Sequence, residues 1–235
     1  LRPWLSDRRE QFFLASKTDE RTGEGAYAGL VRSLERLGVE QLDLIQLHNL
    51  VEEDEFEQAH AKGGAVEALA RARDEGLVRF IGVTGHGLRI PSMHVRSLDR
   101  FPFDSVLFPY NYLLMRDASY RRDAEELIDR CVAEGVALQT IKSVARRRWP
   151  APIEYSNHQS WYEPLEDVSA IDRAVRFVLG HEHLFLICSS DYRLLDATLE
   201  AAEASPRVPL DDELDDDISR FDMHTLFDGG ELERI

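Results

Sequence analysis

One local pattern recurs along this chain and limits its fold more than any other feature. A short apolar run ends in polar residues, a helical stretch follows, and a glycine precedes the next apolar run. The runs are apolar on both faces, which is typical of strands buried between helices. They are Phe12–Ser16, Leu42–Leu47, Val78–Val83, Ser105–Phe108, Val136–Ile141 and Leu184–Cys188. The alternation predicts an α/β fold with parallel strands and crossover helices.

The stretches between these runs carry a helical period. Apolar residues recur at steps of three and four, as on one face of an amphipathic helix. In the first stretch they are Tyr27, Leu30, Leu34 and Leu37. Glycines follow the helices, where we expect positive φ to end each helix: Gly38, Gly76, Gly135 and Gly180. The acidic stretch Asp211–Asp217 is predicted to begin another helix, because carboxylates favour helix N-termini.

The number of repeated units bounds the architecture. Six strand–helix units fit an open doubly wound sheet or most of a closed barrel. The Gly-x-Gly-x-x-Gly signal of a dinucleotide-binding open sheet does not follow the first run, which favours the barrel. We predict one domain over residues 1–235, a length that supports one sizeable core. Because the first residue is Leu1 rather than Met, we expect the natural N-terminus to be missing.

The net charge of -16 makes this an acidic protein and argues against nucleic acid as a partner, because phosphate backbones would be repelled. No apolar run approaches the roughly 20 residues of a membrane span, and no secretory leader is evident. Cys131 and Cys188 lie in apolar runs and are interpreted as buried free thiols, so we expect a cytoplasmic protein. Lysine is scarce beside arginine, which fits either a GC-rich genome or a salt-adapted surface.

Polar residues follow the apolar runs at the point where each predicted strand ends. Lys17 follows the first run and His48 the second. In a parallel barrel, chemistry gathers at the carboxyl ends of the strands. A desolvated lysine has a lowered pKa and can polarise a neighbouring acid, and a histidine can orient a carbonyl oxygen. The sequence therefore predicts an active site containing these two side chains.

Several segments resemble the aldo-keto reductase family, in its bacterial and archaeal branch. The resemblance covers roughly Leu5 to Ala204. The segments are FFLASKT (Phe12–Thr18), GAYAGLVRSLERLGVEQLD (Gly25–Asp43), LDLIQLHN (Leu42–Asn49), GAVEALARARDEGLVRFIGVTGH (Gly64–His86), WYEPLEDVSAIDRAVRFVL (Trp161–Leu179) and ICSSDYRLLDATLEA (Ile187–Ala201).

This resemblance implies a (β/α)₈ TIM barrel whose first two strand–helix units are absent from the chain. It implies an NAD(P)H-dependent oxidoreductase that reduces an aldehyde or ketone to an alcohol. Lys17 matches the catalytic lysine of the family and His48 its histidine. The family's aspartate and tyrosine have no counterpart in this sequence, which leaves a second hypothesis open. In that hypothesis the chain is a non-catalytic nucleotide-binding relative that acts as a sensor or regulatory subunit.

The resemblance also implies a cofactor, NADP(H), with NAD(H) as the alternative. Five positions match family residues that contact it: Thr84, Ile141, Ser190, Asp191 and Thr198. Asp196 stands where an arginine often binds the 2′-phosphate, and a carboxylate there would repel that phosphate. The expected partner is a small-molecule carbonyl compound.

Three further features keep alternatives open. The three arginines Arg146–Arg148 either face a pyrophosphate or form a solvated loop. The aromatic residues Trp161 and Tyr162 either line a substrate pocket or cover the outside of the barrel. The His181–His183 motif lacks a third ligand, so a turn is favoured and no metal is predicted. A different class of barrel enzyme, an aldolase, would use Lys142 to form a Schiff base.

Overall fold

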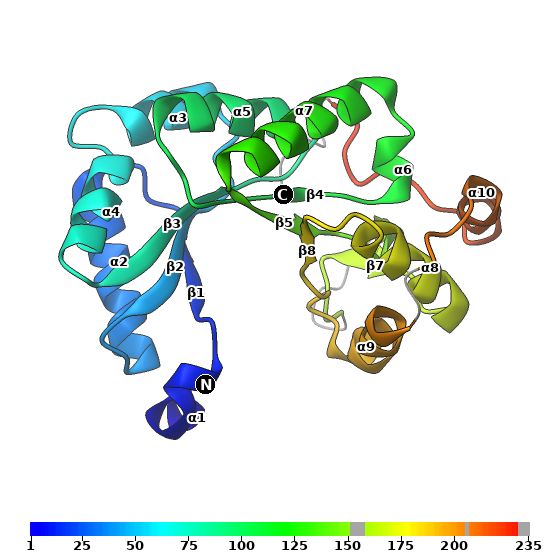
Figure 1. Ribbon diagram of the computed structural model, residues 1–235, viewed down its shortest axis with the longest axis horizontal. Coiled ribbons are helices and arrows are strands. Elements are labelled where there is room, and N and C mark those ends of the chain that lie inside the picture. The colour runs from blue at the N-terminus through cyan, green and yellow to red at the C-terminus, as the bar shows by residue number, and fades with distance from the viewer. Residues whose placement is uncertain (151–157, 205–206, 230–235) are drawn as a thin grey trace. The chain divides into compact units, whose positions relative to one another are not determined.

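The computed structural model describes residues 1–150, 158–204 and 207–229 (Figure 1). Six strands form a mostly parallel sheet in the order β1-β2-β3-β4-β5-β8, so the fold is α/β as predicted. The chain divides into two compact units. Unit 1 contains Leu1–Gly85 and Met93–Leu107, and unit 2 contains His86–Ser92 and the chain from Phe108 onward.

Unit 1 is built on parallel strands that pair in sequence order. Lys17 of β1 lies opposite Gln46 of β2, Leu44 of β2 opposite Phe80 of β3, and Thr84 of β3 opposite Leu107 of β4. The strands are β1 (Ala15–Thr18), β2 (Leu42–Leu47), β3 (Val78–Thr84) and β4 (Ser105–Pro109), of which β4 crosses into unit 2. The helical segments are α1 (Arg2–Arg8), η1 (Arg9–Gln11), α2 (Gly23–Leu37), α3 (Glu53–His60), α4 (Ala65–Asp74) and α5 (Ile90–Arg100).

Local chemistry explains where these elements begin and end. Every residue of β2 is buried, as expected for a strand with helices on one side and strands on both edges. Helix α2 begins after Thr22, whose Oγ1 accepts a hydrogen bond from the Gly25 amide at 3.2 Å. It ends at Gly38, which has the expected positive φ of 69°. Figure 1 shows α2 and α4 beside the strands of this unit.

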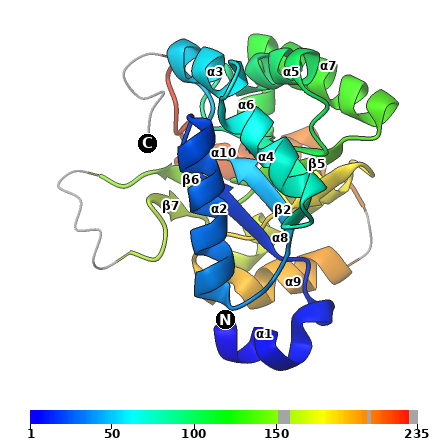
Figure 2. The same cartoon turned by 90° about the vertical axis from the view of Figure 1, so that its left-hand side faces the viewer.

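Unit 2 continues with two parallel strands and a small antiparallel pair. Leu138 of β5 pairs with Leu184 of β8. Figure 2 shows β6 and β7 side by side, and Arg148 of β6 pairs with Tyr162 of β7. The strands are β5 (Ala137–Ile141), β6 (Ala145–Arg148), β7 (Tyr162–Pro164) and β8 (Leu184–Leu186). The helical segments are α6 (Tyr112–Met115), α7 (Ala118–Glu134), α8 (Val168–Leu179), η3 (Tyr192–Leu194), α9 (Leu195–Glu203) and α10 (Asp211–Arg220).

The structure confirms the six predicted strands as elements and corrects the boundaries of the first and the last of them. The first strand begins at Ala15 instead of Phe12, because η1 occupies Arg9–Gln11 and leaves Phe12 and Phe13 exposed. The acidic stretch that begins at Asp211 does start a helix, α10. The β6–β7 pair was not predicted.

Two predictions about individual residues are wrong. Gly180 has φ -65°, so positive φ does not explain it. A Cβ at this position would lie 2.6 Å from Cγ2 of Val208, so a side chain there would require Val208 to shift. Cys188 is exposed because β8 ends at Leu186, two residues before it, whereas Cys131 in α7 is buried as predicted.

Candidate functional site

The carboxyl ends of β1 and β2 bring Lys17 and His48 into one region of unit 1. Lys17 pairs with Gln46, and the His48 amide donates a hydrogen bond to the Thr18 carbonyl at 2.9 Å. Directly opposed residues of neighbouring strands share a face of the sheet, and so do residues two apart. Thr18 faces α2, since its Oγ1 would lie 3.1 Å from a Cβ at Gly29. Lys17 therefore lies on the opposite face of the sheet from α2.

His48 is oriented by a carboxylate that the sequence analysis did not identify. Its Nδ1 lies 2.6 Å from Oδ1 of Asp19, the residue two positions after Lys17. A carboxylate only accepts hydrogen bonds, so Nδ1 carries the proton in this contact, and Asp19 sets the tautomer of the neutral ring. The imidazole is about one third exposed, which keeps it within reach of a small molecule. The alternation of β1 could have identified Asp19, since it lies on the same side of the strand as Lys17.

Lys17 carries a perturbed ammonium group. Its side chain reaches solvent, but the surrounding protein removes part of the water around Nζ, and this desolvation lowers the pKa of Lys17. The nearby Asp19 carboxylate acts in the opposite direction. One carboxylate thus influences both side chains that the sequence singled out.

The loop after β2 is held by buried hydrogen bonds. The Arg21 guanidinium donates to the His48 carbonyl at 2.6 Å and to the Asn49 carbonyl at 3.2 Å. Thr84, predicted to contact the cofactor, is 1% exposed, and its Oγ1 accepts a hydrogen bond from the Asn49 amide at 3.0 Å. Its hydroxyl hydrogen is not used in that bond. The structure therefore brings Thr84 beside the loop that carries His48.

The other predicted cofactor residues lie in unit 2. Ile141 ends β5, where its carbonyl accepts a hydrogen bond from the Tyr110 amide at 3.0 Å. Ser190 and Asp191 lie in the loop after β8, and Ser190 Oγ donates to the Gln159 carbonyl at 2.9 Å. Thr198 is buried in α9.

Two contacts restrict what the loop after β8 offers to a cofactor. The Thr198 hydroxyl donates to the Leu194 carbonyl one turn earlier, at 2.8 Å, so its proton is already used. Asp191 accepts two hydrogen bonds from the Arg193 guanidinium, and these bonds lower the pKa of the Asp191 carboxyl. Arg193 is exposed and was not singled out from the sequence. The position that aligns with the family's 2′-phosphate-binding arginine lies three residues later and is occupied by Asp196.

The arginines of β6 are held by contacts within unit 2, two of them with carboxylates. Arg146 and Arg147 each bind Glu163 of β7 at 2.7 Å, and Arg147 also contacts Asp222. Arg148 donates to the Leu226 carbonyl at 2.6 Å. These contacts favour a structural role for the three arginines over pyrophosphate binding. Trp161 is half-buried and Tyr162 is buried in this unit, where they form a core cluster with Leu226 and Phe227.

A second group of side chains gathers at strand ends in unit 2. Lys142, directly after β5, is 4% exposed, and its Nζ contacts Nδ1 of His86. Phe227 and Trp161 cover the same amine, with ring centroids at 4.9 and 5.1 Å. Among the hypotheses based on the sequence, only the aldolase alternative uses Lys142, and none assigns a role to His86. The available signal was the scarcity of lysine, together with a histidine after β3, which β4 separates from β5 in the sheet.

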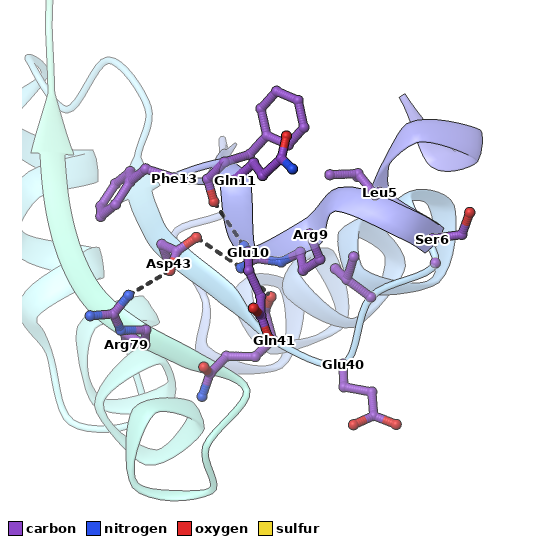
Figure 3. Close-up of a pocket in the computed structure, with 13 residues that line it drawn as sticks. Leu5, Ser6, Arg9, Glu10, Gln11, Phe13, Glu40, Gln41, Asp43 and Arg79 are labelled. Carbon is purple, nitrogen blue, oxygen red and sulfur yellow. Dashed lines mark hydrogen bonds and ion pairs between the residues drawn. The ribbon is translucent and has the colours of Figure 1, made fainter.

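A hollow of about 800 Å³ lies at the opposite, amino ends of β1 and β2 (Figure 3). Asp43 lies beside it, between Arg9 at 2.8 Å and Arg79 at 2.7 Å, and also accepts the Leu14 amide at 2.7 Å. Burial alone would raise the pKa of Asp43, but the Leu14 amide and the Arg79 and Arg9 guanidiniums together hold it below its usual value. Because two guanidiniums and a backbone amide already satisfy the Asp43 carboxylate, we assign the cluster a structural role.

Neither a membrane helix nor a cluster of metal ligands occurs in the described ranges. No helix there is long and apolar enough to cross a membrane. No group of three or more metal-ligating side chains is found there. The His181–His183 segment forms a turn before β8, with the two imidazole centroids 5.9 Å apart.

Comparison with known proteins identifies the family. Residues 1–149, more than half of the chain, match the model of the aldo/keto reductase family. The chain belongs to this family. The matched segment contains Lys17, His48 and Thr84.

One curated relative and several solved structures extend this result. The chain is 27% identical over 117 residues to D-threo-aldose 1-dehydrogenase of a Pseudomonas species. That match covers 50% of this chain but only 32% of the relative, so the chain spans about a third of the curated relative's length.

Solved structures of aldo-keto reductases share the fold. One is the holo form of AKR11C1 from Bacillus halodurans, with a TM-score of 0.61 and 21% identity, covering 92% of this chain and 75% of that one. Another is MGS-M4, from a Medee basin deep-sea metagenome library, with a TM-score of 0.57 and 14% identity, covering 91% and 74%. At these identities the likeness establishes the fold alone.

Proposed function

We propose that this chain is the larger part of an NAD(P)H-dependent carbonyl reductase that converts an aldehyde or ketone to an alcohol. The observation that carries the proposal is the grouping of Lys17, Asp19 and His48 at the carboxyl ends of β1 and β2. These are the side-chain types that carbonyl reduction needs beside a bound nicotinamide. Membership of the aldo/keto reductase family supports the same conclusion.

The fold of the complete protein is part of this proposal. We propose a single domain in which two further strand–helix units precede Leu1 and complete a (β/α)₈ barrel. Both ends of the strand order support this. The β1 residues Ala15 and Lys17 are exposed, and so are Phe185 and Ile187 at β8. Strands inside a closed barrel are normally buried and have a neighbouring strand on each side. The two terminal strands of this sheet, β1 and β8, are therefore suited to pairing with further strands.

In carbonyl reduction the carbon atom accepts a hydride, while the oxygen atom gains negative charge that must be stabilised. The bound cofactor supplies the hydride. As the carbonyl oxygen becomes an alkoxide, it needs hydrogen-bond donors and a nearby positive charge. His48 Nε2, directed by the Asp19 bond at Nδ1, donates to that oxygen when the ring carries both protons, and it accepts from the alcohol when it carries one.

Lys17 supplies the positive charge. Its ammonium is partly desolvated, so its field acts on the developing alkoxide through less water than a fully solvated charge would. By resemblance, the proton itself comes from a tyrosine in the preceding units, which Lys17 would polarise.

The residues proposed to bind the cofactor suit its nicotinamide end better than its phosphate end. Thr84 has a free hydroxyl hydrogen beside the His48 loop, which suits the nicotinamide carboxamide. Ile141 at the end of β5 offers an apolar surface for the ring. Ser190, Asp191 and Thr198 are the proposed residues for the phosphate end. The hydroxyl hydrogens of Ser190 and Thr198 are already donated to backbone carbonyls, and Asp191 is paired with Arg193, so the fit is poorer at this end. We propose NADP(H), with NAD(H) as the alternative because of Asp196.

The partner we propose is a small carbonyl compound, with neither nucleic acid nor a membrane involved, and the proposed location is the cytoplasm. The test is a fluorescence titration of the complete gene product with NADPH and NADH, with aldehyde turnover followed in the same samples. Saturable binding with turnover supports the reductase. Binding without turnover over a broad aldehyde panel overturns it in favour of a nucleotide-binding sensor.

A further inference from the structure

Lys142 occupies a strained backbone position at the end of β5. Its φ is 68°, in the left-handed region that a residue with a side chain rarely adopts. The Asn111 side-chain amide donates to the Lys142 carbonyl at 2.9 Å, and the Ala145 amide donates to it at 3.2 Å. These bonds hold the strained conformation and direct the side chain into unit 2.

The side chain ends in an enclosure that we call the Lys142 cage, formed by Lys142, His86, Trp161 and Phe227. Nζ contacts Nδ1 of His86 and lies over both aromatic rings. The His86 and Phe227 rings are stacked, with centroids 6.5 Å apart. Among the described residues no carboxylate lies within ion-pair distance of Nζ. A buried ammonium is normally paired, so this environment is unusual for a lysine.

The cage favours the neutral amine. Burial strips water from the ammonium, and the positive charge of Arg148 adds repulsion, so the pKa of Lys142 falls well below its usual value. The two rings attract a cation and offset part of this cost. A neutral amine keeps its lone pair and is a nucleophile, which a protonated lysine is not.

The contact with His86 supplies what such a nucleophile needs. An imidazole can take a proton from one atom and deliver it to another near neutral pH. His86 follows β3 and is half-buried, and its Nδ1 meets Nζ directly. If Lys142 served only to fill the core, a leucine or methionine would do so without the desolvation cost.

We propose that Lys142 is a carbonyl-reactive amine that captures small, unhindered aldehydes as an imine, with His86 transferring the protons. The aromatic walls and the 4% exposure of Lys142 limit the class to small aldehydes. This site lies within unit 2 and requires neither a nicotinamide nor Lys17. The proposal is therefore independent of the reductase function.

The chemistry balances without an oxidant or reductant. The Nζ lone pair forms a bond to the aldehyde carbon, and the π electrons move to oxygen. His86 carries one proton from Nζ to this oxygen, which gives a carbinolamine. The protonated imidazole of His86 then donates a proton to the hydroxyl, the C–O bond breaks, and water leaves as the nitrogen lone pair forms the C=N bond. The iminium nitrogen finally returns its last proton to the imidazole. The products are one imine and one water, and hydrolysis reverses every step.

The chain's lysine content makes the test simple. The lysines are Lys17, Lys62 and Lys142, of which Lys62 is exposed. The complete protein is incubated with propionaldehyde and sodium cyanoborohydride without nicotinamide, and propyl groups are located by peptide mass spectrometry. We expect Lys142 to be labelled more than about tenfold faster than Lys62, because each unit of lowered pKa raises the neutral fraction about tenfold. Equal or slower labelling of Lys142 overturns the proposal.

Two comparisons separate the cage from intrinsic reactivity. In urea, the preference for Lys142 must vanish, since unfolding removes the cage; a preference that survives overturns the proposal. In the native protein, H86Q should slow labelling of Lys142 by about tenfold or more and leave Lys62 unchanged, because general acid–base catalysis is typically worth at least that factor. Unchanged labelling in folded H86Q would overturn the role of the imidazole. If H86Q fails to fold, the comparison of Lys142 with Lys62 in the wild-type protein still decides the proposal.

Discussion

Asp19 Oδ1 lies 2.6 Å from His48 Nδ1, and this contact joins the loop after β1 to the loop after β2. The two residues are 29 positions apart in the chain. Their partnership sets which imidazole nitrogen carries the proton, and it places a carboxylate close enough to Lys17 to influence its pKa. The orientation of the imidazole and the charge of the lysine therefore depend on the same carboxylate.

Removing the Asp19 carboxylate should impair turnover without unfolding the protein. In D19A the imidazole loses its orienting partner, so we expect kcat for aldehyde reduction to fall by roughly tenfold. Asp19 is 83% exposed, and the thermal midpoint should therefore stay within a degree or two. Steady-state kinetics of D19A beside E126A, which removes an exposed carboxylate from α7, provide the measurement. Equal kcat in both variants would argue against the orienting role.

Lys17 should matter for chemistry rather than for cofactor affinity. We expect K17A to lose about a hundredfold or more in kcat, because a charge beside the alkoxide and its proton donor is removed. The dissociation constant for NADPH, from fluorescence titration, should change little. K62A removes an exposed lysine and serves as the matched control. Wild-type turnover in K17A would contradict the proposed active site.

Loss of His48 should depend on the substrate. An activated aldehyde needs little help in accepting a hydride, whereas an unactivated ketone depends on a donor to its oxygen. We therefore expect H48A to reduce kcat/KM by about tenfold more for unactivated ketones than for electron-poor aldehydes. A comparison of the two substrate classes in wild type and H48A gives this ratio directly. A uniform loss would mean that His48 contributes to binding alone.

Asp43 should give the protein an acid-dependent component of stability. Its folded-state pKa is lowered, so its contribution is full above the unfolded-state value of about 3.9 and is lost as pH falls through the folded-state pKa. At pH 7, D43N should lower the free energy of unfolding by about 2 kcal/mol, since charged hydrogen bonds to Arg9 and Arg79 are lost. Below about pH 4 the difference from wild type should shrink.

The measurement for Asp43 is urea unfolding at several pH values between 3 and 7. D129N changes an exposed carboxyl of α7 and should follow the wild-type curve throughout. A D43N deficit that stays constant down to pH 3 would show that the charge of Asp43 is not what stabilises the amino end of β2.

Asp196 should determine which cofactor is preferred. It lies exposed in the first turn of α9, where a carboxylate repels a 2′-phosphate and an arginine would attract it. We expect D196R to improve the ratio of NADPH to NADH affinity by roughly tenfold, equivalent to about 1.4 kcal/mol. E203R makes the same charge change about 10 Å further along the helix and should alter the ratio much less. Equal shifts in both variants would indicate a general charge effect.

The sequence predicted most of the secondary structure because hydrophobic periodicity records which side of each element is buried. β2 is buried along its length, as its largely apolar run indicated, and α2 ends at the expected glycine. Where a boundary was wrong, a local cause explains it: η1 displaced the start of β1 and left Phe12 and Phe13 in solvent. The β6 strand, Ala145–Arg148, carries no apolar period and could not be recognised.

The site was predictable only in part. Lys17 and His48 could be placed near each other because parallel neighbouring strands end on the same side of a sheet. Asp19 could have been found from strand alternation, but its bond to His48 depends on the path of two loops. The role of Thr198 rested on the resemblance alone, and the structure shows its hydroxyl turned to the Leu194 carbonyl within the helix.

By itself the sequence determined the order of strands and helices, the family, and the two strand ends that carry Lys17 and His48. These follow from patterns a few residues long, because burial and strand direction are read locally. The tertiary structure alone decided that Asp19 orients His48, and that His86 and Phe227 enclose Lys142. Such contacts join residues far apart in the chain, and which of them meet is set by how turns and loops pack, which no local pattern records.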